Sequence, residues 1–129
     1  MPNIYIAGPM TGYDEFNYPA FHAMGDILID NGYVPLSGAH THFCSDPRKS
    51  KVKPPHPDHT RPYEDYLRYA ISELMYADGI IFLEDANQSP GAQLERRIAA
   101  ALRLTEYHIV DNNTVEAKTD PLTPEFPAL

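Results

Sequence analysis

The stretch from Ala77 to Leu104 constrains the fold most, because it combines a buried strand, a short loop and a helix in direct succession. Residues 79–83 (GIIFL) form a continuous apolar run, as is typical of parallel strands that are covered on both faces. Ser89 and Pro90 then have the residue types of a helix N-cap and of a first helical position. A strand that leads directly into a helix predicts an α/β fold with a mainly parallel sheet.

The rest of the chain repeats this alternation and predicts the order of the elements. Apolar patterning predicts strands at 3–7, 33–36 and 107–110, and helices at about 17–31 and from about residue 60 onwards. We expect a single α/β domain, residues 1–110, with a flavodoxin/Rossmann-like sheet of four to five strands in the order 2-1-3-4 and helices on both faces. Residues 111–129 are rich in proline and are expected to form an extended or disordered tail.

The helix that follows Ser89 has a polar residue at an unusual place. At about 100° per residue, the apolar residues that share one face, and are expected to be buried, are Leu94, Ile98, Ala101 and Leu102. Arg96 and Arg103 fall on the opposite face. Glu95 projects towards the seam between the core and the preceding loop, where burial would raise the pKa of its carboxyl group unless neighbours stabilise the anion. The alternative is that Glu95 lies at the edge of the stripe and reaches water.

A glycine-bounded loop, residues 8–12 (GPMTG), follows the first strand. In the order 2-1-3-4 the first and third strands are neighbours, so this loop and loop 84–89 meet at the topological switch point, where open α/β sheets bind ligands. The helix start at 89–91 adds backbone N–H groups and a dipole that suit an anion. The loop is neither a Walker loop nor a GxGxxG motif, and the alternatives are a simple tight turn at 8–12 and a plain cap at Ser89.

The charge and the cysteine content exclude several classes of protein. The net charge of −8 argues against binding to a nucleic acid polymer, because no basic stripe exists to neutralise phosphates. The single cysteine, Cys44, cannot form an intrachain disulfide and suits a reducing compartment. The N-terminal sequence does not have the pattern of a signal peptide, and no apolar run has membrane-spanning length. We therefore expect a cytoplasmic protein with no membrane partner.

A segment rich in histidine and proline, at about 37–60, interrupts the regular alternation. Its candidate metal ligands are His40, His42, Cys44, His56 and His59. Their spacing matches no common zinc pattern, so we expect no metal, and a metal site remains an alternative. A loop of this length is often functional, as a lid or an oligomer contact.

Three segments resemble the nucleoside 2-deoxyribosyltransferase superfamily: residues 4–12 (IYIAGPMTG), 63–83 (YxxYLRxAIxxLxxADGIIFL) and 89–95 (SPGAQLE). The likeness covers roughly residues 3–110 without the insert and is greatest to small phage and bacterial members. Related enzymes include the 2′-deoxynucleoside 5′-monophosphate N-glycosidases. The resemblance implies cleavage or transfer at the N-glycosidic bond of a nucleoside or nucleotide, with no cofactor, in a homo-oligomer.

The resemblance also implies roles for individual residues. Glu95 would attack the anomeric carbon, and Tyr5 would lie beside it, beneath the sugar. Ser89 and Gly91 would hold the 5′ end of the sugar or a 5′-phosphate. The other residues expected to bind substrate are Gly8, Met10, Thr11, Gly12 and Asp78.

One position departs from the family pattern. These enzymes usually carry an aspartate near the leaving base, in the helix before the third strand, where this chain has Ala70. Glu64, Asp65 and Glu73 are the nearest acids in that helix, and none occupies the matching position. The departure favours an alternative in which the crevice binds a nucleotide or a nucleotide-derived signal without turnover. A second alternative is a metal-binding protein that uses the insert.

Overall fold

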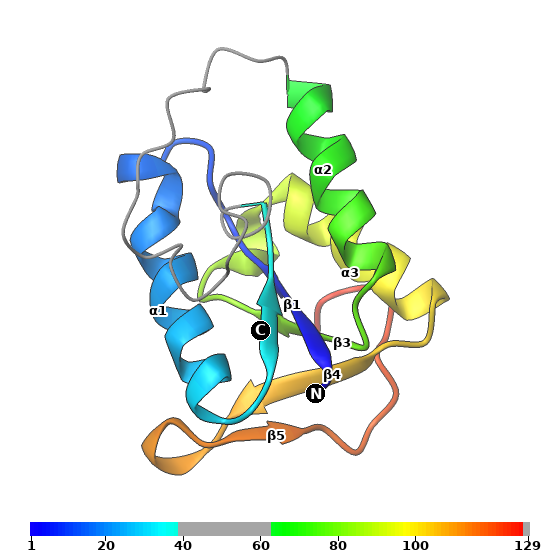
Figure 1. Cartoon of the computed structure of the whole chain (residues 1–129). Helices are drawn as coiled ribbons and strands as arrows, with labels where there is room; N and C mark the ends of the chain where they lie inside the picture. The colour runs from blue at the N-terminus through cyan, green and yellow to red at the C-terminus, as the bar shows by residue number, and fades with distance from the viewer. Residues whose placement is uncertain (39–62, 128–129) are drawn as a thin grey trace.

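A five-stranded sheet in the order β2-β1-β3-β4-β5 forms the centre of the computed structural model, which describes residues 1–38 and 63–127 (Figure 1). The strands are β1 (Asn3–Ala7), β2 (Val34–Leu36), β3 (Gly79–Phe82), β4 (Thr105–Ile109) and β5 (Val115–Ala117). The first four are parallel, and β5 pairs with β4 in the antiparallel direction. The predicted order 2-1-3-4 is therefore confirmed, with one strand added at the edge.

Strand β1 lies between β2 and β3 and contributes to the core on both faces of the sheet. Successive side chains of a strand point to opposite faces, so Ile4 and Ile6 enter one apolar cluster while Tyr5 and Ala7 enter the other. All four side chains are at most 2% exposed. This double burial explains why the strand is apolar without alternation.

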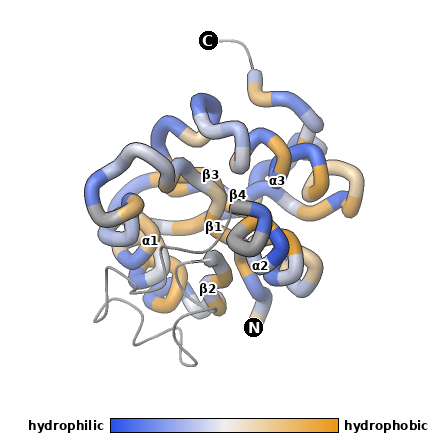
Figure 2. Tube along the Cα trace, turned by 90° about the horizontal axis from the view of Figure 1, so that it is seen from above, coloured by the Kyte–Doolittle hydropathy of each residue, from blue (hydrophilic) through white to orange (hydrophobic). Residues whose placement is uncertain are grey.

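The helices cover both faces, as expected for this fold class. Helix α1 (Tyr18–Asp30) packs on one face, and helices α2 (Tyr63–Met75) and α3 (Pro90–Ala101) pack on the other. Seen from above, the apolar strands β1 and β3 lie between α1 and the α2–α3 pair (Figure 2). Within the described residues, no helix is long and apolar enough to cross a bilayer.

The segment after residue 110 is more regular than the extended or disordered tail expected from its composition. Val115, in β5, is 6% exposed. Asn31, at the end of α1, holds this region in place: its Oδ1 accepts from Val115 N–H at 3.1 Å, and its Nδ2 donates to the Asn113 carbonyl at 2.9 Å. Further along, Leu122 and Phe126 pack against the core cluster on the α2–α3 face. These contacts join residues too far apart for local composition to reveal.

Helix α3 also buries a different face from the one predicted. Its buried residues are Ala92, Glu95, Arg96 and Ala99, whereas Leu102 is 50% exposed. The guanidinium carbon of Arg96 lies 5.0 Å from the ring centre of Phe82 and 4.6 Å from that of Phe126. The assignment of Arg96 to the solvent face was therefore wrong, because an aromatic side chain from residue 126 covers it.

The insert lies outside the described residues except for Ser37 and Gly38. This applies to all five candidate metal ligands named above, and so to the alternative that depends on them. In the ranges 1–38 and 63–127, no group of three or more His, Cys, Asp or Glu side chains is arranged to hold a metal ion.

Candidate functional site

A cavity of about 610 Å³ lies at the C-terminal ends of β1 and β3. Its walls come from β1 and the loop that follows it, from α1, from α2 and from the start of α3. This is the ligand position expected for an open parallel sheet. The volume falls in the range of roughly 300–1,000 Å³ that is usual for small-molecule sites.

Most of the residues expected at the site lie around this cavity. Those that line it are Tyr5, Gly8, Met10, Thr11, Ser89, Gly91 and Glu95. They come from two separate stretches of sequence, 5–11 and 89–95, and the pairing of β1 with β3 brings the two together. Their roles in binding or chemistry remain predictions.

Two expected residues do not line the cavity. Asp78 lies just before β3, at the opposite edge of the sheet, where its Oδ2 accepts from the backbone N–H of Asn3 at 2.8 Å. A ligand at the C-terminal edge is remote from this position, so the assignment of Asp78 to substrate binding is corrected to a structural role. Gly12 is exposed in a turn with φ +85°, a backbone conformation that favours glycine without any ligand.

The carboxyl group of Glu95 is buried and hydrogen-bonded. The side chain is 6% exposed, and its Oε2 accepts from the hydroxyl of Tyr5. Burial raises the pKa of Glu95 from 4.5 to about 7, although the Tyr5 hydrogen bond opposes this. Burial, followed by the charge of Glu95, raises the pKa of Tyr5 well above its ordinary value, so Tyr5 stays protonated and donates. The alternative in which Glu95 projects into water is not what the structure shows.

The burial of Glu95 predicts an unusual dependence of stability on pH. The pKa of Glu95 is raised in the folded state, so the unfolded chain loses its proton first, and stability falls as the pH rises from 4.5 to about 7. Glu95→Gln removes this penalty, and its amide oxygen still accepts from Tyr5. We expect the variant to gain about 1–3 kcal/mol in free energy of unfolding at pH 8 and little at pH 4. Urea unfolding at both pH values measures this, and an equal change at both would contradict it.

Ser89 caps helix α3. Its side-chain oxygen accepts from Ala92 N–H at 3.2 Å, and Pro90 occupies the first helical position. The predicted cap is confirmed, and Ser89 also lines the cavity. The N–H of Gly91 has no acceptor within the helix by α-helical geometry. The start of α3 therefore offers a backbone donor and a partial positive charge to the cavity.

Gly8 lies too close to Leu83, the residue after β3, to carry a side chain without strain. A Cβ at this position would lie 2.8 Å from the Cβ of Leu83, which is closer than real contacts allow. We expect Gly8→Ala to lower the free energy of unfolding by about 1–3 kcal/mol, as overpacking does. Gly38→Ala is the matched control, since Gly38 also lines the cavity but, among the described residues, a Cβ there would meet only Met10 Cε at 3.8 Å. Equal thermal stability of the two variants would contradict this account.

Sequence reasoning missed the aromatic and apolar part of the lining. The additional residues include Tyr13, Tyr18, Phe21, Leu67 and Tyr69, and the lining also contains Ala70. Ala70 thus lies at the cavity, where the resemblance places an aspartate. The density of tyrosine and phenylalanine between residues 13 and 21 was the available signal, but it is equally typical of core positions.

Comparisons with known proteins give one match. No curated protein and no solved structure matches this chain. One family model, described as "Domain of unknown function (DUF4406)", matches residues 2–108. This range contains β1 to β3, α3 and every cavity residue considered above. The chain therefore belongs to the DUF4406 family.

Proposed function

We propose that this protein cleaves or transfers the N-glycosidic bond of a nucleoside or nucleotide, with Glu95 as the nucleophile. The observation that carries the proposal is a nearly buried carboxyl group at a cavity of suitable size, held by Tyr5 and placed beside the start of α3. The resemblance of residues 4–12 and 89–95 to nucleoside 2-deoxyribosyltransferases supports the same chemistry.

Cleavage of this bond builds positive charge on the sugar. In the proposed first step the Glu95 carboxylate forms an ester bond to the anomeric carbon, and the electron pair of the broken C–N bond leaves with the base. The base takes a proton from water or a hydroxyl donor. In the second step a second base, or water, attacks the same carbon, the ester bond to Glu95 breaks with its electron pair returning to the carboxylate, and the attacking group loses a proton to solvent, which gives transfer or hydrolysis.

Tyr5 orients the nucleophile. Its hydroxyl binds Oε2, which leaves Oε1 as the oxygen available to the sugar. Because Tyr5 stays protonated, it can hold the carboxylate without competing for the sugar carbon. The start of α3, with Ser89 and the N–H of Gly91, suits the polar 5′ end of the sugar.

An assay of the wild-type chain tests the proposal. Deoxynucleosides, ribonucleosides and their 5′-monophosphates are incubated with the protein, and free base is separated by chromatography. We expect release of free base from at least one of these classes of nucleoside or nucleotide. Adding a second base and looking for an exchanged nucleoside separates a transferase from a hydrolase. No product from any member of the panel would contradict the proposal.

Ala70 supports a second candidate function. Without an acid at this position of the cavity wall, departure of the base loses the assistance that the related enzymes have. A protein that binds the ligand and does not turn it over would show tight binding by calorimetry in the absence of product. A homo-oligomer is expected for either function, and light scattering measures it.

A further inference from the structure

Two partly exposed tyrosines line the cavity from elements that are far apart in sequence. Tyr13 lies in the loop after β1 and is 40% exposed, and Tyr69 lies in α2 and is 38% exposed. Helices α1 and α2 stand apart at this end of the molecule, with the end of β1 between them (Figure 1). Partly exposed aromatic side chains that line a cavity are typical of binding sites.

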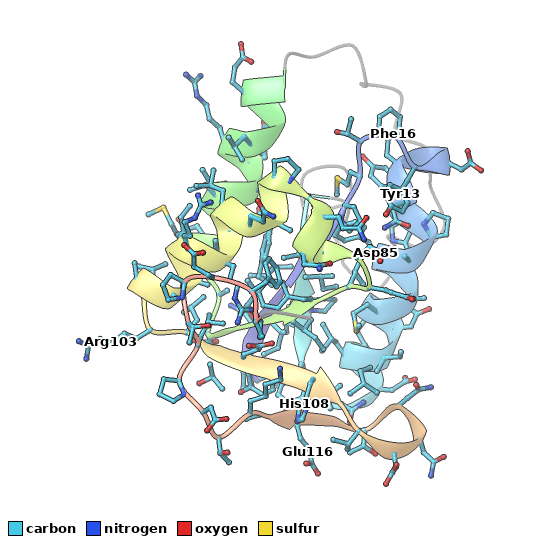
Figure 3. The ribbon with its side chains drawn as sticks, turned by 180° about the vertical axis from the view of Figure 1, so that it is seen from behind. Tyr13, Phe16, Asp85, Arg103, His108 and Glu116 are labelled. Carbon is cyan, nitrogen blue, oxygen red and sulfur yellow. The ribbon has the colours of Figure 1, made fainter. Side chains whose placement is uncertain are left out.

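The loop that carries Tyr13 is held in an unusual conformation. Phe16 and Asn17 both have positive φ, at 54° and 62°, which is uncommon outside glycine. Asn17 Nδ2 donates to the Pro9 carbonyl at 2.9 Å, and Tyr13 N–H donates to the Met10 carbonyl at 3.2 Å. These hydrogen bonds stabilise the conformation of the loop that carries Tyr13. Figure 3 shows Tyr13 and Phe16 near the start of α1, at the end of the molecule opposite His108 and Glu116.

The wall on the α2 side is apolar around Tyr69. Leu67 and Ala70 line the cavity beside it. The described lining residues of α2 carry no charge, and the Ala70 side chain has no hydrogen-bonding group, so a ligand that meets these residues is held mainly by ring contact. The carboxyl group of Glu95 belongs to a different part of the lining, where α3 faces β1.

We propose that Tyr13 and Tyr69 form the base-binding subsite, which holds an uncharged planar heterocycle by stacking and prefers purines to pyrimidines. This inference rests on the proposed function, and it names the part of the substrate that each wall recognises. Every base has a π-face, so a stacking subsite accepts all bases. A purine buries more ring surface than a pyrimidine, which gives the preference its direction.

Calorimetric titration with deoxyadenosine and deoxycytidine tests the subsite. All variants are made in a Glu95→Gln background, so that the ligand is not consumed and turnover is not needed. We expect Tyr13→Ala and Tyr69→Ala each to weaken deoxyadenosine binding by roughly tenfold or more. Tyr13→Phe and Tyr69→Phe should stay within about threefold of the parent, because the ring and not the hydroxyl makes the contact.

Tyr76→Ala is the matched control. Tyr76 comes directly after α2, the helix that carries Tyr69, and is 75% exposed, but it does not line the cavity. It should bind like the parent. The inference is overturned if the alanine variants at 13 and 69 bind normally, if the phenylalanine variants lose as much as alanine, if deoxycytidine binds more tightly, or if neither nucleoside binds. Failure of base release in wild-type protein, with ring-dependent binding intact, would contradict the proposed function alone.

Discussion

Glu95→Gln is expected to lower the rate of base release by at least about 10³-fold, which is the scale of losing a covalent nucleophile. Glutamine has nearly the same shape and keeps an oxygen that accepts from Tyr5, but its amide does not form the glycosyl ester. The reaction also requires the ionised form of Glu95. Its pKa is about 7, so wild-type activity should rise with pH and level off above neutrality.

Chromatographic measurement of free base over a range of pH checks both parts of this prediction. Glu116→Gln provides the matched control, since it makes the same change at an exposed residue of β5, at the far end of the molecule (Figure 3). Urea unfolding of Glu95→Gln at pH 8, where a gain in stability is expected, also checks that the variant is folded. Base release within tenfold of wild type would rule out the nucleophilic role.

Arg96→Ala is expected to lower the free energy of unfolding by about 3 kcal/mol, as removal of one partner from a buried ion pair does. Arg96 is 4% exposed, and its Nη2 lies 3.5 Å from Glu106 Oε1. The change removes the contacts with the rings of Phe82 and Phe126. It also leaves the half-buried Glu106 with Lys118, whose Nζ lies 3.0 Å from Oε2.

Urea unfolding of Arg96→Ala and Arg97→Ala measures this effect. Arg97 is the next residue in α3 and is exposed. The free energy of unfolding of Arg97→Ala should therefore be within about 0.5 kcal/mol of the wild-type value. Arg96→Met keeps an apolar side chain between the rings of Phe82 and Phe126. Its free energy of unfolding should therefore fall between those of Arg96→Ala and Arg97→Ala. Similar midpoints for Arg96→Ala and Arg97→Ala would show that the buried guanidinium contributes little.

The fold followed from local patterns because those patterns are strong. Apolar runs at 3–7 and 79–83, each followed by a loop and a helix, leave few arrangements other than a parallel sheet with both faces covered. The strand order then placed the loops after β1 and β3 side by side. This is why the sequence alone predicts Gly8, Ser89 and Glu95 at one site.

The same rule explains why Asp78 was assigned incorrectly. It belongs to a motif that resembles a family, but it precedes β3, and the ligand edge of a parallel sheet is the other one. The aromatic walls at Tyr13 and Tyr69 were missed for a different reason. They line the same cavity only because the loop after β1 and helix α2 meet at this end of the sheet, which periodicity within either segment does not describe.

The burial of Arg96 shows the limit of helix periodicity most clearly. An arginine on a helix is normally assigned to solvent, and the apolar stripe of α3 was drawn on that basis. What reverses the assignment is Phe126, 30 positions later in the sequence, together with Glu106. Contacts at that distance along the chain leave no trace in a helical pattern.

The hydrogen bond between Tyr5 and Glu95 joins residues 90 positions apart. Its donor lies on β1, the first strand of the chain, which pairs on both sides with strands made later. A fragment of the chain that ends before α3 lacks Glu95 and cannot contain this bond. If the chain were divided between β1 and β3, the two fragments would have to pair these strands to restore it. The cavity therefore depends on contacts of long sequence separation, which cost more loop-closure entropy than the local contacts of a helix.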